Sequence, residues 1–228
     1  MGQETMIKAQ AQPTVFVIDD DPAIRQGISS LLRSVNICAE MFGSPKEFLP
    51  ENLPDAPCCL VLDVRLGSSS GLDLQAELDN AEINIPIVFI TGHGDIPMSV
   101  RAMKAGAVEF LTKPFRDQDL LDAVRVALER DRQQREKNKS LAILRSCFET
   151  LTPREQEVFA LVATGLMNKQ IATQLGVSEI TIKVHRGNLT RKMGARSFAD
   201  LVRMADALKL PAIAPSIGGG TRPSRALK

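Results

Sequence analysis

The first half of the chain alternates apolar runs of strand length with stretches of helical periodicity. The runs are nearly uninterrupted, as in strands that are buried on both faces of a sheet, and they cover residues 14–18, 37–42, 58–62, 85–90 and 107–111. Between them, apolar residues recur at intervals of three or four, for example at Ile24, Ile28 and Leu31. This alternation predicts a doubly wound α/β fold around a five-stranded parallel sheet.

Polar residues follow four of the predicted strands, as Asp19-Asp20-Asp21, Asp63, Thr91 and Lys113-Pro114. Ligands of such sheets bind beside the carboxyl ends of the strands, so we expect Asp19, Asp20 and Asp63 to converge if the first and third strands are neighbours. Clustered carboxylates repel one another unless a cation joins them, and an all-oxygen ligand set favours Mg²⁺. A hydroxyl and an ammonium facing carboxylates suit a phosphoryl group. Asp63 begins a Gly/Ser-rich loop and is the predicted nucleophile.

Each of these residues also has a simpler interpretation. Asp20 or Asp21 suits the N-cap of the helix that follows, because Asp before Pro is a good helix start. Thr91 suits a loop or a cap, Lys113 a solvated surface and Asp63 a turn. The hypothesis of a site therefore rests on the four strand ends taken together.

Four segments resemble the receiver domain of two-component response regulators, namely VFVIDDDPAIR, LVLDVRLGSSSG, IVFITGHGD and GAVEFLTKPF. The resemblance covers about residues 13–128 and implies a flavodoxin-like strand order 2-1-3-4-5. It implies that Asp63 accepts a phosphoryl group from a phosphohistidine of a sensor histidine kinase. It also implies that Mg²⁺ is held by three carboxylates and one backbone carbonyl, from Asp19, Asp20, Asp63 and Arg65.

The resemblance extends to the residues that transmit the signal. Thr91 and Phe110 match the family's switch pair, whose movement remodels the face around the fifth strand. Lys113-Pro114 matches a pair joined by a cis peptide bond. One position departs from the pattern, because the family usually has proline where this chain has Gly67, followed by Ser68–Ser70. A loop rich in Gly and Ser is less preorganised, which predicts a phosphorylation rate or phosphate lifetime that differs from the family norm.

Charge divides the chain into an acidic front and a basic back. Residues 1–128 carry 10 basic and 18 acidic side chains, whereas residues 151–228 carry 12 basic and 5 acidic ones. This asymmetry predicts two domains with different partners, of which the basic one suits a polyanion. Between them, the run ERDRQQREKNKS has no Gly or Pro and dense mixed charge. We therefore expect one long helix over about 117–145, with a solvated helical linker at 129–148.

The last third of the chain predicts an all-α domain of four helices, at about 153–164, 168–175, 179–193 and 198–208. A tight turn at Gly176-Val177-Ser178 joins the second helix to the third, which is the pattern of a helix-turn-helix. On the third helix, one face suits bases in a major groove and the positions beside it suit phosphates. The first set is Lys183, Val184, Gly187, Asn188 and Arg191, and the second is Thr181, Arg186 and Lys192. A solvated face is the alternative interpretation, but the helix-turn-helix pattern and a net charge of +7 over residues 151–228 favour DNA.

The segment LTPREQEVFALVATGLMNKQIATQLGVSEITIKVHRGNLTRKMGARS resembles the LuxR-type DNA-binding domain of the NarL/FixJ regulators. The resemblance implies that Lys183, Val184 and the Gly187 position face bases, and that the last helix pairs two domains on DNA. We therefore predict a receiver at 13–128, a linker at 129–148, a DNA-binding domain at 149–210 and a disordered Pro/Gly-rich tail at 211–228.

The predicted function is that of a response regulator. A sensor histidine kinase phosphorylates Asp63, and a homodimer then binds promoter DNA and activates transcription, with RNA polymerase as a further partner. Such a protein acts catalytically only in its own phosphoryl transfer and autodephosphorylation. Two alternatives remain open: a Mg²⁺-dependent phosphotransferase or phosphatase that uses Asp63 on small substrates, and a DNA-binding regulator that works without phosphorylation.

Composition predicts a cytoplasmic protein. No apolar run reaches the roughly 20 residues of a membrane span, and no secretory signal is visible at the N-terminus. The four cysteines form neither a C-x-x-C pair nor a metal-binding spacing, at Cys38, Cys58, Cys59 and Cys147. We interpret them as reduced thiols.

Overall fold

The computed structural model describes residues 12–50, 53–67, 69–92 and 96–210. Ser68 and the tail 211–228, which the sequence predicts to be disordered, lie outside these residues. The chain divides between Glu136 and Lys137 into two compact units, and each is described by itself. Among the described residues, no helix has the length and apolar character needed to cross a membrane.

The first unit contains a five-stranded parallel sheet in the order β2-β1-β3-β6-β7. This order confirms the predicted 2-1-3-4-5 arrangement, because two short extra strands, β4 and β5, account for the shift in numbering. The strands are β1 (Thr14–Ile18), β2 (Cys38–Phe42), β3 (Cys58–Asp63), β4 (Arg65–Leu66), β5 (Ser69–Ser70), β6 (Ile87–Thr91) and β7 (Glu109–Thr112). The helices are α1 (Pro22–Ser34), α2 (Gly71–Asn80), α3 (Ile96–Lys104) and the first part of α4 (Asp117–Glu149), with a 3-10 turn at Pro45–Glu47.

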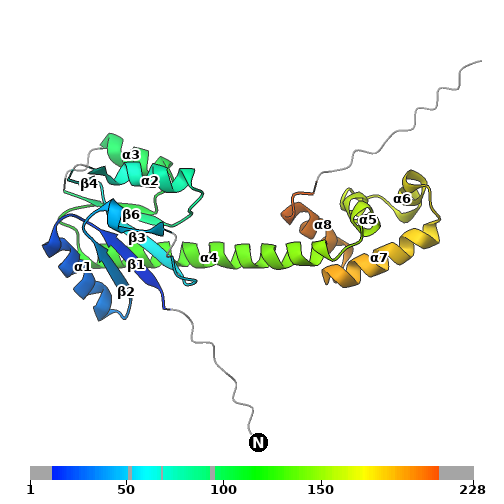
Figure 1. Cartoon of the computed structure of the whole chain (residues 1–228), viewed down its shortest axis with the longest axis horizontal. Helices are drawn as coiled ribbons and strands as arrows, with labels where there is room; N and C mark the ends of the chain where they lie inside the picture. Colours follow the sequence, from blue (N-terminus) through cyan, green and yellow to red (C-terminus); the bar gives the residue numbers. More distant parts are fainter. Residues whose placement is uncertain (1–11, 51–52, 68, 93–95, 211–228) are drawn as a thin grey trace, which may run out of the picture. The chain divides into compact units, whose positions relative to one another are not determined.

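Helices cover both faces of this sheet (Figure 1). Along β1, Val15 and Val17 pack in the core that includes α1 and α4, whereas Phe16 and Ile18 pack in the core that includes α2 and α3. Strands buried on both sides need apolar residues at successive positions. This requirement explains why the strands of this unit appear in the sequence as continuous apolar runs rather than as alternating patterns.

A short hairpin follows β3. Strands β4 and β5 pair antiparallel, with Arg65 opposite Ser70 and Leu66 opposite Ser69. Gly67 has a φ of 58°, a left-handed value that glycine adopts at no steric cost and proline cannot reach. The residue that departs from the receiver pattern therefore starts the turn of this hairpin, and Ser69 and Ser70 belong to a strand rather than to an open loop.

Past the apolar core, two polar residues of α4, Asp131 and Arg135, continue its contacts within the first unit. Asp131 is buried, and its Oδ2 accepts hydrogen bonds from the Cys58 amide at 2.8 Å and from Arg135 Nε at 2.6 Å. Burial, with the nearby Asp131 carboxylate, raises the pKa of the Cys58 thiol to about 11, and burial likewise raises the pKa of the Cys59 thiol. Both cysteines are therefore protonated thiols, and they pack in the two cores of the sheet.

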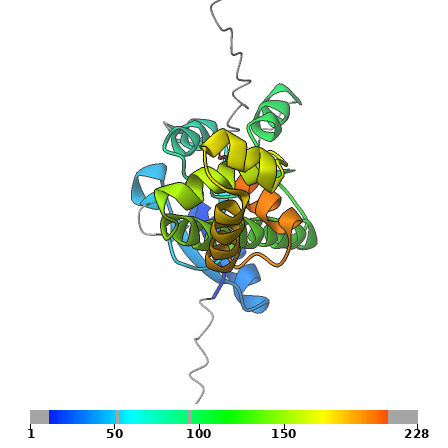
Figure 2. The same ribbon diagram turned by 90° about the vertical axis from the view of Figure 1, so that its right-hand side faces the viewer.

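The second unit consists of helices around a single core (Figures 1 and 2). They are α5 (Pro153–Ala163), α6 (Asn168–Leu175), α7 (Glu179–Met193) and α8 (Phe198–Ala207), and the end of α4 packs against the same core through Leu144 and Phe148. The bounds of α6 and α7 match the predicted ones. Gly176, with a φ of 65°, ends α6, and the Ser178 side chain caps α7.

Candidate functional site

Three polar side chains lie at the carboxyl ends of neighbouring strands. Asp19 follows β1, Asp63 ends β3 and Thr91 ends β6, and the sheet order makes these strands adjacent. All three side chains are buried. The parallel register, in which Asp63 lies opposite Ile90, keeps the ends of β3 and β6 level. The fold thus brings together three predicted site residues that are up to 72 positions apart in the chain.

Lys113 joins the two buried carboxylates. Its Nζ lies 2.6 Å from Asp19 Oδ2 and 2.7 Å from Asp63 Oδ2, and the Lys113–Pro114 peptide bond is cis. Burial raises the pKa of the Asp19 carboxyl, although the Lys113 ammonium and the Asp21 amide act in the opposite direction. Burial also tends to lower the pKa of Lys113, but its hydrogen bonds to Asp19 and Asp63 outweigh this effect and raise it. The ammonium is therefore charged at neutral pH and faces the carboxylates.

The two aspartates that follow Asp19 have separate roles. The side chain of Asp21 caps α1, because its Oδ1 accepts a hydrogen bond from the Ala23 amide at 2.8 Å. Asp20 is exposed, and one of its carboxylate oxygens lies within 4.8 Å of oxygens of Asp19 and Asp63. The capping interpretation therefore applies to Asp21 and leaves Asp20 beside the other two carboxylates.

This donor set fits a divalent metal ion. Ligands on opposite sides of a Mg²⁺ ion are about 4.2 Å apart, and all three residues offer the hard oxygen atoms that Mg²⁺ prefers. The three carboxylate oxygens lie within 4.8 Å of one another, which is close to that span.

The backbone packs closely around Asp63. Its Oδ1 accepts a hydrogen bond from the amide of Arg65 at 2.9 Å, and Arg65 itself is exposed at the start of β4. Gly71 begins α2 beside this segment, and a Cβ at that position would lie 2.3 Å from the carbonyl oxygen of Asp63. Only glycine therefore allows α2 to begin at this point.

Two further residues complete this end of the sheet. Phe110 of β7 is half-buried, and its ring centroid lies 6.3 Å from that of Phe89 in β6. Arg25 of α1, which sequence reasoning missed, donates a hydrogen bond from Nη1 to the carbonyl oxygen of Asp19 at 2.5 Å. Its position one turn after the acidic triplet is the only sequence signal that pointed to it.

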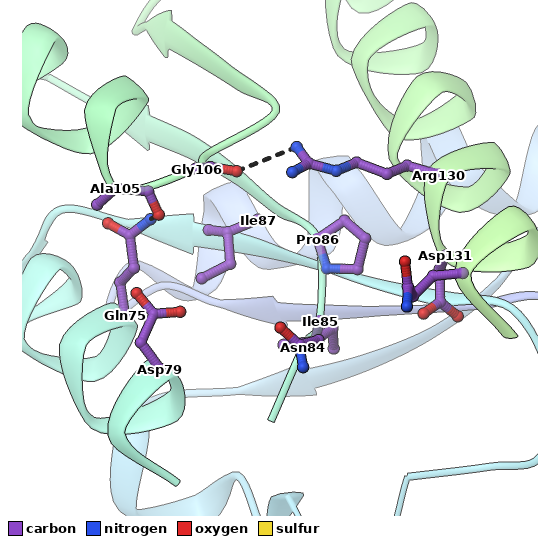
Figure 3. A pocket seen from close by; sticks show the side chains of 11 residues that line it. Gln75, Asp79, Asn84, Ile85, Pro86, Ile87, Ala105, Gly106, Arg130 and Asp131 are labelled. Carbon is purple, nitrogen blue, oxygen red and sulfur yellow. Dashed lines mark hydrogen bonds between the residues drawn. The ribbon is translucent and has the colours of Figure 1, made fainter. Parts of the chain in front are cut away.

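A separate cavity of about 290 Å³ lies at the opposite end of the sheet (Figure 3). It is lined by the start of β6, by α2, by the turn between α3 and β7, and by α4. Arg130 crosses one side of it and donates a hydrogen bond to the carbonyl oxygen of Gly106, while Gln75 donates to that of Ala105. These bonds connect elements of the first unit at the end away from the carboxylates.

In the second unit, α7 presents most of the predicted base-contacting residues to solvent. Lys183, Val184, Gly187 and Arg191 are exposed, and Asn188 is half-buried. The opposite side of α7, at Ile182, Leu189 and Met193, lies in the core. Ile180 is 77% exposed and lies one turn before Val184, so it adds an apolar residue that sequence reasoning missed.

The three predicted phosphate-contacting residues have partners inside the unit. Thr181 Oγ1 lies 2.8 Å from Ser178 Oγ. Arg186 binds Asn168, and Lys192 binds Glu155. The spacing of the sequence placed these side chains beside the exposed face but gave no sign of the partners.

Comparison with known families matches both units. Residues 15–125 match the response regulator receiver domain, and residues 149–205 match the bacterial regulatory proteins of the luxR family. Together the two matches span more than half of the chain.

Individual proteins match over nearly their full lengths. Nodulation protein W of Bradyrhizobium diazoefficiens is 57% identical over 92% of this chain and 93% of its own. The response regulator protein TodT of Pseudomonas putida is 48% identical over 86% of each chain. The transcriptional regulatory protein FixJ of Rhizobium meliloti is 39% identical over 84% of this chain and 94% of its own.

Two solved structures of response regulators also resemble this chain over most of its length. The response regulator StyR has a TM-score of 0.74 and 49% identity, over 86% of this chain and 99% of its own. Full-length FixJ from B. japonicum has a TM-score of 0.52 and 34% identity, over 87% of this chain and 98% of its own. The chain therefore belongs to the NarL/FixJ family of two-component response regulators, in which a receiver domain and a LuxR-type DNA-binding domain share one polypeptide.

Proposed function

We propose that Asp63 accepts a phosphoryl group from a phosphohistidine of a sensor histidine kinase. A carboxylate oxygen of Asp63 attacks phosphorus, the new O–P bond forms as the N–P bond breaks, and the electron pair of that bond returns to the imidazole nitrogen. Lys113 then pairs with a phosphoryl oxygen, and the Thr91 hydroxyl donates a hydrogen bond to another. Attack of water on phosphorus releases inorganic phosphate and regenerates the carboxylate. The observation that carries this proposal is the Lys113 ammonium between Asp19 and Asp63, at 2.6 and 2.7 Å.

The same proposal includes Mg²⁺ as the cofactor. Asp19, Asp20, Asp63 and the backbone carbonyl of Arg65 would hold the ion, and support comes from the three carboxylate oxygens within 4.8 Å of one another. When bound, Mg²⁺ neutralises the charge of the carboxylates and of the incoming phosphoryl oxygens. Asp63 and Lys113 then supply the nucleophile and the paired cation.

Phosphorylation is proposed to act through Thr91 and Phe110. The Thr91 hydroxyl moves toward the phosphoryl group, and the Phe110 ring turns inward, which remodels the face around β7. Support comes from the position of Thr91 at the end of β6 and from the half-buried ring of Phe110 on the neighbouring strand. The remodelled face promotes formation of a homodimer, releases the DNA-binding domain, or does both.

The output of this switch is proposed to be promoter binding by α7. Lys183, Val184, Gly187, Asn188 and Arg191 would contact bases, and Thr181 would contact a phosphate beside them. Two such domains in a homodimer would meet half-sites about one helical turn apart and recruit RNA polymerase as an activator. A kinase partner and a chromosomal target place this activity in the cytoplasm.

In this proposal, three consecutive segments of the chain have different roles. Residues 13–128 receive the phosphoryl group, residues 129–148 form the helical linker and residues 149–210 bind DNA. The two family matches, at 15–125 and 149–205, support the outer two segments. The continuous helix α4 (Asp117–Glu149) supports the helical character of the linker.

Labelling with a small phosphodonor tests the acceptor. Full-length protein incubated with Mg²⁺ and radiolabelled acetyl phosphate should form an acid-stable, base-labile adduct, which Asp63→Asn should abolish. Asp73→Asn, at an exposed carboxylate in the first turn of α2, is the matched control and should be labelled like the wild type. Undiminished labelling of Asp63→Asn would refute the assignment.

Two rival functions give different results. Steady turnover of a small phosphate ester would favour the phosphotransferase or phosphatase alternative. Equal DNA affinity with and without the phosphodonor would favour a regulator that is independent of phosphorylation. We expect neither, because residues 149–205 match a family of regulatory proteins and Lys113 bridges the carboxylates of Asp19 and Asp63.

A further inference from the structure

Arg186 of α7 is held inside the second unit by two neighbouring helices. Its Nη1 donates a hydrogen bond to Asn168 Oδ1 at 2.5 Å, and its guanidinium carbon lies 5.6 Å from the ring centroid of Phe198. Asn168 is the first residue of α6, and Phe198 is the first residue of α8. A guanidinium both bonds in its plane and stacks on an aromatic face. Arg186 therefore joins three helices at the middle of α7.

Lys192 joins the end of α7 to the start of α5. Its Nζ lies 2.6 Å from Glu155 Oε2 and 3.2 Å from the carbonyl oxygen of Thr150. Glu155 is only 4% exposed, and the same Oε2 accepts a hydrogen bond from the amide of Thr152 at 2.9 Å, which completes the capping box of α5. Withdrawing Lys192 to bind a phosphate would leave Glu155 buried without its cation, and an unpaired buried charge is costly.

We propose that Arg186 and Lys192 are positioning residues, which set α7 against the other helices of the unit and thereby orient its exposed side for DNA. This inference rests on α7 being the DNA-reading helix. It differs from the expectation drawn from the sequence, in which both cations contact phosphates. Lys183 would keep its base contact, and the exposed Arg191, in the last turn of α7, would bind a phosphate in addition to a base.

The two roles predict different dependence on salt. A cation that neutralises a phosphate releases a counterion, so its loss lowers the slope of log Kd against log salt concentration by about 0.9. A positioning residue releases none, and its loss misplaces the helix without changing the slope. Misplacement should weaken binding to the specific site more than binding to random DNA, because only base contacts require the exact orientation.

The experiment uses the full-length chain treated with acetyl phosphate and a duplex obtained by in vitro selection. Kd values are measured on that duplex and on random DNA between 50 and about 300 mM salt, for wild type and for R186Q, K192Q and R191Q. Because a homodimer loses one such contact in each of its two protomers, we expect R191Q to lower the salt slope by about 1.8. We expect R186Q and K192Q to keep the wild-type slope while their ratio of specific to random affinity falls by about tenfold, since about 1.4 kcal/mol corresponds to a factor of ten. A slope lowered by R186Q or K192Q as much as by R191Q would overturn the proposal for that residue.

Charge-conserving and partner variants keep the test decisive if R186Q or K192Q folds poorly. R186K keeps the positive charge but loses the planar fork, so a positioning role predicts weaker specific binding and a phosphate contact predicts nearly normal binding. N168A removes the partner of Arg186 and should reproduce the effect of R186K, with a double variant that is little worse than either. Normal specific binding by both N168A and R186K would overturn the proposal.

A different set of results would show that α7 does not read the DNA. If K183A and R191Q both bound the selected duplex like the wild type, α7 would not be the DNA-reading helix, and the inference would fail with it. Loss of binding in those two variants together with unchanged specificity in N168A would refute only the positioning role.

Discussion

The position of Asp63 depends on a glycine at residue 71, because the backbone leaves no room there for a side chain. The backbone amide of Gly71 donates to the carbonyl oxygen of Val64 at 2.9 Å, and its Cα faces the carbonyl oxygen of Asp63 so closely that a Cβ would lie 2.3 Å away. The neighbour in this contact is backbone rather than a flexible side chain. Any larger residue must therefore move either the start of α2 or the acceptor.

Gly71→Ala should destabilise the chain by about 1–3 kcal/mol, as overpacking does, and should slow labelling of Asp63 by a phosphodonor. Unfolding followed by far-ultraviolet circular dichroism measures the first effect, since the chain has no Trp or Tyr for fluorescence. Gly27→Ala is the matched control, because a Cβ there meets nothing within 4 Å. It should stabilise α1 by about 0.5–1 kcal/mol. Normal stability of Gly71→Ala would contradict the contact.

We expect the stability of the second unit to depend on pH through the Glu155 carboxyl. The hydrogen bond from Lys192 and that from the Thr152 amide lower the pKa of this carboxyl below its ordinary value of 4.5. Because the unfolded chain binds the proton more readily, the contribution of Glu155 to stability is present above pH 4.5 and is lost as the pH falls through the lower, folded-state pKa.

Hydrogen exchange of peptides from α5 and α7 measures this loss between pH 6 and about 3. After correction for intrinsic exchange rates, protection in the wild type should fall as the pH drops below about 4.5. Glu155→Gln should be less protected at pH 6 and should flatten the dependence. Glu157→Gln, on the exposed side of α5, is the control and should retain the wild-type profile. An unchanged profile in Glu155→Gln would show that another group is responsible.

At the scale of single elements, α7 combines a buried side with an exposed side that contains a glycine. Gly187 lies in the interior of the helix, and a Cβ at that position would meet nothing within 4 Å. Glycine inside a helix costs about 1 kcal/mol relative to alanine. None of the described residues of the second unit requires glycine there, whereas the proposed close approach of DNA would require it.

Gly187→Ala should therefore separate stability from binding. We expect the variant to be more stable by about 0.5–1 kcal/mol in denaturation, while its Kd for a selected duplex rises because the added methyl group faces the bases. Mobility-shift titration measures the Kd, with random DNA as the reference. Equal or tighter specific binding would exclude close approach at this position.

Elements with long periodic patterns could be predicted from the sequence, whereas contacts between elements could not. The bounds of α6 and α7 agree because apolar spacing marks both helices, Gly176 ends α6, and Ser178 and Gly194 cap the two ends of α7. The hairpin β4–β5 was missed, since strands of two residues carry no periodicity. Asp131 lies in a highly charged run and was expected on a solvated helix, yet it is buried against the Cys58 amide. A charged run gives no sign of which member has a partner far away in the chain.

For the whole molecule, the decisive feature is that each unit has its own core. Two clusters of apolar residues lie on the two faces of the sheet, and a third lies among α5–α8 and the end of α4. The candidate metal ligands all belong to the first unit. Binding of an ion stabilises the state that holds it, by an amount that depends on concentration.

Addition of Mg²⁺ should therefore stabilise one unit selectively. At a concentration ten times Kd, the free energy of unfolding should rise by about 1.4 kcal/mol for the sheet. Hydrogen exchange should slow in peptides from β1, β3 and β6 and should stay unchanged in α5–α8. Asp20→Asn, which removes an exposed ligand, should abolish the effect with little change in the absence of Mg²⁺. Equal slowing in that variant would assign the ion to another place.

The contacts of Asp131 and Arg135 with the start of β3 also bear on the making of hybrid regulators. A fusion of this receiver domain to a foreign DNA-binding domain, with the junction at the end of the family match near residue 125, would remove both side chains and expose the Cys58 amide to solvent. A junction after Glu136 retains them. Fusions of this chain are therefore best joined about three helical turns after the end of the family match.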